Sequence, residues 1–279
     1  MKKGEKVKMI IDTHVHIGSL LGFDLSEEKV LESMQKYNID YALVSSIDST
    51  ELDFDQKEIP KELQISQEDS LKSVLAFARQ YPEKIGVLVW VKPYGETISE
   101  EFVTLIEKNL DIIYGLKVHQ YHSKTALDDP KMLPYLELAR RFQFPVVAHT
   151  DGKNEAAVIH VWNAAKANPD IDFVMVHMGL GTDNSEAIQL LGTLPNLYGD
   201  TTWVPLESTL KAIETAGSEK MLFGSDNPID GVDTYHHNPK GEPSVYQSYF
   251  KELEKKAGTE AYENIMYKNA IRLFGLHSI

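Results

Sequence analysis

Short runs of apolar and β-branched residues alternate with longer amphipathic segments along the whole chain. The short runs have the length of buried strands, and the longer segments carry apolar residues at helical spacing. Eight strands are predicted, at 9–14, 41–46, 85–91, 113–119, 145–149, 173–177, 197–202 and 221–226. Helices are predicted between and after them, at 26–37, 67–81, 99–109, 130–142, 154–167, 184–192, 205–215, 244–256 and 260–275. This alternation predicts βα units and a parallel sheet.

Eight strand–helix pairs with no second unit left over favour a closed barrel over an open sheet. The 279 residues also suit one barrel domain. We therefore predict an α/β fold, a single (β/α)8 TIM barrel over 1–279. Two long connections, 47–66 and 227–243, each follow a strand and would overhang the C-terminal face, where loops form lids or substrate walls. A tolerated surface insertion is an equally good interpretation of 47–66.

The composition argues against several classes of function and of metal ligand. The formal net charge of −14 disfavours binding to a phosphate backbone, so no nucleic-acid partner is expected. No run approaches the ~20 apolar residues of a membrane span, and the basic start lacks the apolar stretch of a signal peptide. We expect a cytoplasmic protein with no membrane partner. The chain has no cysteine, so any metal must be held by His, Asp, Glu or a modified Lys.

Ligand-capable side chains gather at the carboxyl ends of the predicted strands. Because side chains two apart on a strand share a face, His14 and His16 can converge on one ion. Lys117 and His119 share a face in the same way, and strand eight ends in Asp226. The chemistry of a barrel lies at this end. The sequence therefore predicts a metal site among five strand-end histidines, namely His14, His16, His119, His149 and His177.

Segments spread over nearly the whole chain resemble the amidohydrolase superfamily, and more closely its amidohydrolase-2 (aminocarboxymuconate-semialdehyde-decarboxylase-like) branch. An HxH pair alone is a weak signal, but HxH, His, His and Asp in this order on these strands is a strong one. The segments are IDTHVHIG at 11–18, YPEKIGVLVWVKP at 81–93, GLKVHQ at 115–120, DDPKMLPYLELARRFQFPVVAHT at 128–150, FVMVHMG at 173–179, PNLYGDTT at 195–202, MLFGSDNP at 221–228 and NAIRLFGL at 269–276.

The resemblance implies a divalent metal held by His14, His16, His149 and Asp226. Zinc is the expected ion, with manganese, iron or cobalt as alternatives. By the same resemblance His177 binds a second metal or orients the substrate. Asp226 is then the general base, taking a proton from a metal-activated water and returning it to the leaving group.

Lys117 leaves three interpretations open. In the family's two-metal members a carboxylated lysine bridges the ions, whereas in one-metal members a lysine in this context is a substrate contact or an electrostatic element. The lysine could also form an ion pair with Asp12 or Asp226. We favour one ion, with His177, Lys117 and Asp226 as the catalytic residues.

Other residues are candidates for the pocket. His119, His122 and Trp203 are expected to contact the substrate, with local hydrogen bonding or packing as the alternative. Tyr235, His236 and His237 are plausible pocket walls by the same argument. His160 and His277 are expected to lie outside the site.

The leading hypothesis is a metal-dependent hydrolase that cleaves a C–O or C–N bond, in a lactone, ester or amide, of a small carboxylated molecule. A non-oxidative decarboxylase of the same branch is the main alternative. A TatD-like deoxyribonuclease is disfavoured by charge and by Lys117, where that family has Glu. A binding barrel without activity is disfavoured because no ligand is missing. A homodimer is one possible assembly.

Overall fold

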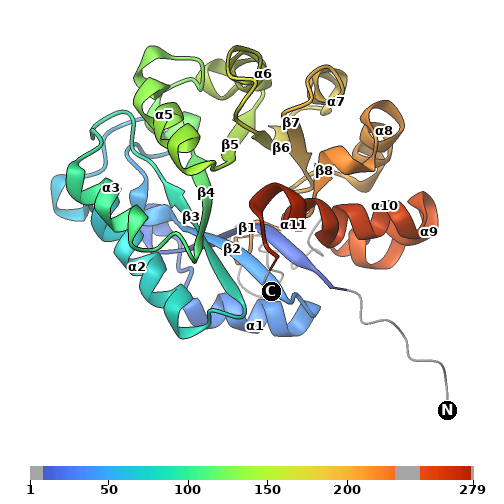
Figure 1. Cartoon of the computed structure of the whole chain (residues 1–279), viewed down its shortest axis with the longest axis horizontal. Coiled ribbons are helices and arrows are strands. Elements are labelled where there is room, and N and C mark those ends of the chain that lie inside the picture. Colours follow the sequence, from blue (N-terminus) through green and yellow to red (C-terminus); the bar gives the residue numbers. More distant parts are fainter. Residues whose placement is uncertain (1–8, 230–245, 278–279) are drawn as a thin grey trace.

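The computed structural model describes residues 9–229 and 246–277. Eight parallel strands lie in one sheet in chain order, and helices surround them (Figure 1). The strands are β1 (Ile11–Ile17), β2 (Tyr41–Ser46), β3 (Ile85–Trp90), β4 (Ile113–Val118), β5 (Val146–Asp151), β6 (Phe173–Leu180), β7 (Leu197–Asp200) and β8 (Met221–Leu222). This architecture confirms the predicted (β/α)8 barrel.

The helices follow the strands as the amphipathic segments predicted. Serine side chains cap the first three long ones: Ser26, Ser66 and Ser99 each accept a hydrogen bond from a backbone N–H of the first turn. The helices are α1 (Glu27–Tyr37), α2 (Gln67–Gln80), α3 (Glu100–Glu107), α4 (Gln120–Ser123), α5 (Leu133–Phe142), α6 (Val158–Ala167), α7 (Ser185–Leu191), α8 (Leu206–Ala216), α9 (Glu254–Ala257), α10 (Thr259–Glu263) and α11 (Asn269–Phe274).

The barrel closes between β1 and the segment that follows β8. The backbone N–H of Thr13 donates to the carbonyl of Phe223, and the N–H of Asp226 donates to the carbonyl of His14, both at 2.9 Å. The strand predicted at 221–226 is therefore shorter than expected, because Asp226 has a φ of 68° and residues 223–227 leave the regular ladder. These residues still bond to β1 and close the sheet.

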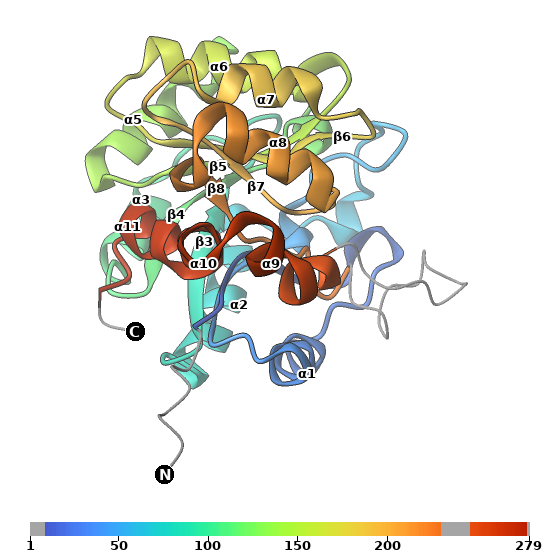
Figure 2. The same ribbon diagram turned by 90° about the vertical axis from the view of Figure 1, so that its right-hand side faces the viewer.

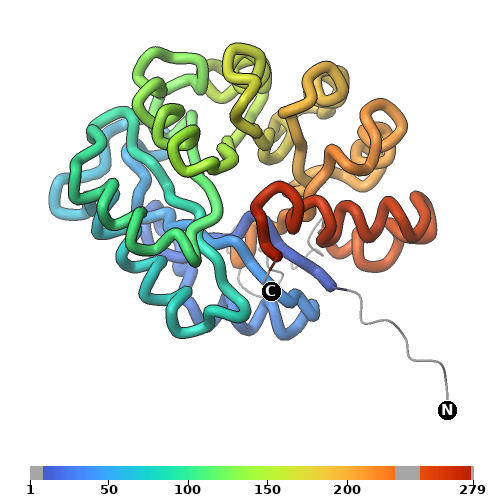
Figure 3. The backbone as a smooth tube through the Cα atoms, in the orientation of Figure 1, coloured from blue at the N-terminus to red at the C-terminus, as the bar shows by residue number. Residues whose placement is uncertain are grey.

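The N-terminal end of the barrel is filled and covered. Ile11, Leu43 and Leu222 from inside the sheet form one buried cluster with Ala270 and Phe274 of α11. Figures 2 and 3 show how the chain returns after β8 so that α10 and α11 lie beside β1. The predicted helix 260–275 is in fact α10, a π-helical turn at Asn264–Lys268, and α11. Among the described residues, the cavity that could admit a small molecule lies at the C-terminal end.

Some strand ends differ from prediction in ways that affect the site. β1 extends to Ile17, so both His14 and His16 lie within it. β4 ends at Val118, and His119 is the N-cap of the short helix α4. The 47–66 connection folds over the barrel mouth with 3-10 turns at Ile47–Ser49 and Lys61–Leu63, while most of 227–243 lies outside the described residues. Within the described ranges, no helix has both the length and the apolar character that a membrane crossing requires.

Candidate metal-binding active site

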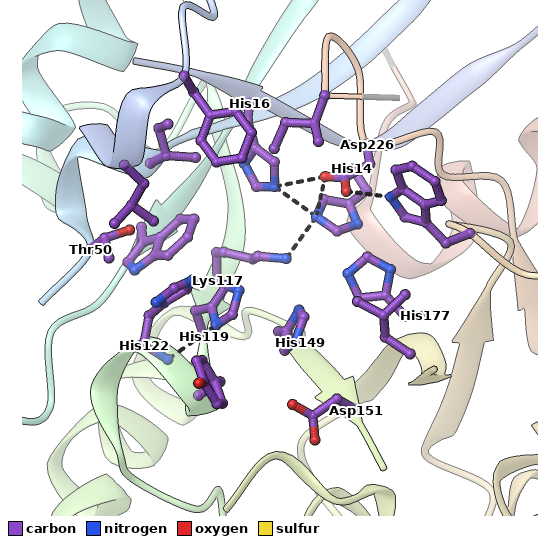
Figure 4. Close-up of a pocket in the computed structure, with 18 of the residues that line it drawn as sticks. His14, His16, Thr50, Lys117, His119, His122, His149, Asp151, His177 and Asp226 are labelled. Atoms are coloured by element: carbon purple, nitrogen blue, oxygen red, sulfur yellow. Dashed lines mark hydrogen bonds and ion pairs between the residues drawn. The ribbon is translucent and has the colours of Figure 1, made fainter. Parts of the chain in front are cut away.

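A cavity of about 550 Å³ opens at the C-terminal end of the barrel. All five strand-end histidines line it together with Lys117 and Asp226, and Figure 4 shows these polar groups facing one another across the cavity. Apolar side chains form much of the remaining wall, among them Leu21, Phe23, Ile47, Phe54, Trp90, Leu180 and Ile229. The strand-end histidines, Lys117 and Asp226, all candidates from the sequence, therefore lie in one pocket.

His14, His16 and Asp226 form the closest ligand group in the described part of the chain, and all three are buried. The Nε2 atoms of the two histidines are 2.8 Å apart. Asp226 Oδ1 lies 3.6 Å from His14 Nε2 and 3.3 Å from His16 Nε2. Ligands about 2.0–2.1 Å from a tetrahedral zinc ion are about 3.3–3.4 Å from each other. Two separations are close to this value and the third is shorter, so a small ion fits the set after a slight outward shift of one imidazole.

The ionisation of this group suits a cation. Burial lowers the pKa of His14 and of His16, which keeps both imidazoles neutral. Burial alone would raise the pKa of Asp226, but the neighbouring His14 and the hydrogen bond from His16 outweigh it and hold that pKa well below its usual range. Metal ions bind neutral imidazole and ionised carboxylate. Two neutral imidazoles and one carboxylate are therefore the charge states that metal ligands require.

Lys117 lies fully buried at the centre of the pocket. Its Nζ is 2.9 Å from His14 Nε2, and within the described residues it forms no ion pair with Asp12 or Asp226. Asp12 instead accepts hydrogen bonds from Ser225 and from the backbone N–H of His14, whereas the charge of Asp226 still acts on Lys117 without a direct contact. Burial lowers the pKa of Lys117 to about 8. Carbamate formation requires a neutral amine, and this environment makes one more accessible.

His149, which the resemblance placed among the ligands, lies outside the close group of His14, His16 and Asp226. The His149 ring stacks on His119 at 3.8 Å between centroids and lies 4.8 Å from the His177 ring. His177 in turn lies 5.3 Å from His14. Both rings are in the same pocket, but the close three-residue group of the described residues does not include His149.

The three predicted substrate contacts all line the pocket. His119 lies between Trp90 and His149 in a stack of parallel rings. His122 Nδ1 bonds to the carbonyl of Leu52 at 2.7 Å and is thereby tied to the 47–66 connection. The Trp203 indole N–H donates to Asp226 Oδ2 at 2.7 Å, so this side chain orients the predicted base as well as forming a wall.

The remaining predicted residues fall outside this pocket. His160 is paired with Asp128 at 2.8 Å on the helical layer, and His277 is exposed near the end of the described chain. Tyr235, His236 and His237 lie outside the described residues.

Three polar residues that touch the ligands were not singled out from the sequence. Ser45 Oγ is 3.0 Å from His16 Nδ1, and Ser45 is the partner of His16 in the β1–β2 register. Thr202 Oγ1 is 3.2 Å from His14 Nδ1, and Asp200 supports Thr202. The GDTT run at the end of β7 was the available signal, because it places a carboxylate and hydroxyls at the catalytic end of a strand.

Backbone strain also concentrates at this site. His177, Trp203 and Asp226 have φ values of 66°, 57° and 68°, in the left-handed region that residues other than glycine rarely adopt. Specific bonds hold two of them: the N–H of His177 donates to Asp200 Oδ1, and the N–H of Asp226 donates to the carbonyl of His14. Strained residues of this kind cluster at functional sites, where the surrounding structure fixes them.

Comparison with known proteins gives one family. Residues 11–276 match the family described as Amidohydrolase. No curated protein matches the chain.

Solved structures share the fold at low sequence identity. A probable 2-pyrone-4,6-dicarboxylic acid hydrolase from Acinetobacter baumannii, with citric acid bound, is 15% identical, covers 95% of this chain and 99% of its own, and has a TM-score of 0.65. A 5-carboxyvanillate decarboxylase from Sphingomonas paucimobilis is 13% identical, with 96% and 99% covered and a TM-score of 0.67. A 4-oxalomesaconate hydratase from Rhodopseudomonas palustris is 14% identical, with 96% of each chain covered and a TM-score of 0.65.

Proposed function

The chain belongs to the amidohydrolase family, and from that premise we propose that it is a metal-dependent hydrolase of a C–O or C–N bond in a small molecule. The observation that carries the proposal is the buried group of His14, His16 and Asp226, which lines the cavity at the C-terminal end of the barrel. It combines two neutral nitrogen donors with a carboxylate that can also act as a base.

His14, His16 and Asp226 would hold the ion, which when bound lowers the pKa of a water molecule and polarises a carbonyl group. His149 is kept as a fourth ligand in the proposal because its ring lines the same pocket. Zinc is the first candidate, with manganese, iron or cobalt as alternatives for a His and Asp set. One ion is proposed. A second would need Lys117 in its carboxylated form, with His177 as a further ligand.

Asp226 would accept the proton of the attacking water and deliver it to the leaving group. Trp203 supports this role because its indole donates to Oδ2, which keeps that oxygen an acceptor and holds the carboxylate in place. Lys117 would donate a hydrogen bond to an anionic oxygen of the substrate, since an ammonium in a buried site interacts strongly with developing negative charge. His177 would orient the substrate from the opposite side.

We infer the class of substrate from the residues that line the cavity. A cavity of about 550 Å³ suits a small molecule. Phe54, Trp90 and Trp203 provide apolar and aromatic surface for its body, and Lys117 provides a cation for a carboxylate. We propose a lactone, ester or amide of a small carboxylic acid.

Activity of the reconstituted protein tests the proposal. The protein would be stripped with a chelator, loaded with one equivalent of zinc or of manganese, and offered a panel of small lactones, esters and amides. We expect hydrolysis only after metal loading, and loss of hydrolysis in Asp226→Asn. His160→Ala is the matched control, because it removes a histidine outside the pocket. A metal-loaded protein that hydrolyses nothing across the panel would count against a hydrolase.

A decarboxylase is the second candidate. The aromatic stack of Trp90, His119 and His149 favours a flat ring beside the same ligand group. Release of carbon dioxide from aromatic or unsaturated acids, without hydrolysis of any ester or amide, would favour this candidate over the first.

A further inference from the structure

His14 is supported from behind by two residues of the β7 end. Its Nδ1, on the side of the ring away from the other ligands, lies 3.2 Å from Thr202 Oγ1 and 3.5 Å from Asp200 Oδ2. The Thr202 hydroxyl donates to Asp200 Oδ2 at 2.6 Å. All three side chains are buried. A continuous chain of polar contacts therefore runs from the carboxylate of Asp200 through a hydroxyl to the metal-facing imidazole.

The direction of these hydrogen bonds decides where the His14 proton lies. An ionised carboxylate only accepts, so Thr202 uses its single proton toward Asp200. Toward His14 the hydroxyl can then only accept, and Nδ1 must carry the hydrogen. On the other side of the ring, the Lys117 amine lies 2.9 Å from Nε2, and an ammonium can only donate. Both contacts thus make Nε2 the unprotonated nitrogen of the His14 ring.

Asp200 also fixes a second pocket histidine through its other oxygen. Oδ1 accepts the backbone N–H of His177 at 2.8 Å and that of Thr202 at 3.2 Å. His177 has a left-handed backbone conformation, and the bond from its N–H to Asp200 helps to hold the residue in it. One carboxylate therefore holds the ring of His14 indirectly and the backbone of His177 directly.

Gly224 packs directly against this chain of polar contacts, and a larger residue would not fit there. A Cβ added at Gly224 would lie 2.8 Å from Asp200 Oδ2 and 3.1 Å from His14 Cβ, and it would also clash with Thr202 Oγ1. Carbon atoms do not approach this closely without displacement. The backbone at Gly224 therefore approaches all three members of the chain as closely as a residue without a side chain allows.

We propose that Asp200 is a positioning residue: acting through Thr202, it keeps the His14 proton on Nδ1 and so presents the Nε2 lone pair to a divalent metal ion. The proposal rests on the metal-dependent function proposed above, and it adds the group that sets the ligand's tautomer. Supporting carboxylates of metal-bound histidines typically change metal affinity by about 10- to 100-fold.

Asp200→Asn is the direct test, because it keeps the shape but changes the donor pattern. If the Asn carbonyl continues to accept the two backbone N–H groups, its NH2 group faces Thr202 and donates to the hydroxyl. The hydroxyl must then donate to His14 Nδ1, which moves the ring proton to Nε2. We expect zinc affinity, measured by competition with a chromophoric chelator, to fall about 10- to 100-fold. Nitrogen NMR of the metal-free protein should show the His14 proton moving from Nδ1 to Nε2.

A second pair of variants keeps the test decisive if Asp200→Asn does not fold. Thr202→Val removes the hydroxyl at nearly constant volume and should weaken zinc binding, whereas Thr202→Ser keeps the hydroxyl and should restore most of it. Thr201→Val is the matched control. Thr201 is equally buried at the same strand end, but among the described residues its hydroxyl bonds to the backbone of Gly224 alone, so this variant should lose stability without losing zinc affinity.

Two results would overturn the proposal. One is a folded Asp200→Asn protein with wild-type zinc affinity and the His14 proton still on Nδ1. The other is equal zinc affinity in Thr202→Val and Thr202→Ser. A wild-type protein that binds neither zinc nor manganese would instead refute the proposed function. The tautomer measured without metal would still decide the role of Asp200.

Discussion

The two sides of the pocket are held in place by different forces. On the side formed by β1, β2, β7 and the segment after β8, directional hydrogen bonds fix each polar group: His14 through Thr202, His16 through Ser45 and Asp226 through Trp203. The opposite wall, formed by β3, β4, β5 and the 47–66 connection, is held mainly by stacked and edge-on rings. Ring contacts tolerate small displacements that a hydrogen bond does not.

This contrast separates two tasks. The hydrogen-bonded side sets the positions and protonation of the ligand atoms, where a change of a few tenths of an ångström alters metal binding. The aromatic wall sets the shape of the space that a substrate body occupies. Substitutions on the first side should therefore change metal content and turnover together, and substitutions on the second should change substrate affinity with the metal retained.

The largest effect is expected on the ligand side. His16→Ala removes one of the three closest donors, so bound zinc should be lost at micromolar ion concentrations. Turnover should fall by at least about 10³-fold, the scale of several kcal/mol of lost stabilisation of the transition state. Metal analysis and steady-state kinetics measure the two losses. Full turnover in a metal-free His16→Ala protein would remove the contrast between the two sides, because the ligand side would then have no special role.

A smaller effect is expected on the aromatic wall. Phe54 packs on His122 at 5.4 Å between ring centroids and is 53% exposed, so it can offer roughly half of its apolar surface to a bound molecule. Phe54→Ala should raise KM about fivefold with unchanged metal content, as expected for about 1 kcal/mol of lost apolar contact.

Leu133→Ala is the matched control for Phe54→Ala. Leu133 is similarly exposed, at 57%, but lies outside the pocket, so its removal should leave KM unchanged. If Phe54→Ala lowered metal content as much as His16→Ala, the separation of tasks between the two sides would be wrong.

The smallest effect on metal binding and turnover is expected where the 47–66 connection is anchored, because the change there is in stability. The buried Glu51 carboxylate accepts the backbone N–H groups of Tyr94 and Gly95, and burial raises its pKa to about 7. The folded protein therefore binds this proton more tightly than the unfolded chain, whose carboxyl has a pKa near 4.5. Stability from this group is fully present below pH 4.5 and is lost as the pH rises through about 7.

Glu51→Gln should abolish that pH dependence. Relative to wild type, the variant should gain stability between pH 4.5 and pH 7, by an amount on the order of 3 kcal/mol for a shift of this size. Thermal unfolding at a series of pH values measures the difference, and metal content should be unaffected. A difference that stays constant with pH would show that Glu51 does not carry the raised pKa.

The fold was predictable because the strand signal is strong where strands are buried on both faces. Runs such as IGVLVW and FVMVH contain almost no polar residue, and eight runs of strand length with helices between them leave little choice of topology. Predictions were least accurate where a strand ends. At β8 the backbone of Asp226 turns out of the ladder, and at β4 His119 begins a helix, features that depend on tertiary contacts.

The site was predictable in its residue types but less so in its geometry. Position on a strand end is enough to place His14, His16, Lys117 and Asp226 in one pocket. It does not predict that Asp12 accepts hydrogen bonds from Ser225, because that contact depends on the path of the chain after β8. The direction of a hydroxyl proton at Thr202 likewise depends on three elements meeting in space.

The seam that closes the barrel is also a place where the barrel can open locally. The ligand group draws His14 and His16 from the first strand and Asp226 from the segment after the last, so an ion bound there would join the two edges of the sheet. Binding that favours the closed barrel stabilises it in proportion to the ion's occupancy. Local opening along this seam should therefore slow when metal is present. Amide hydrogen exchange would report that slowing first at Thr13, His16 and Asp226, whose N–H groups form the seam.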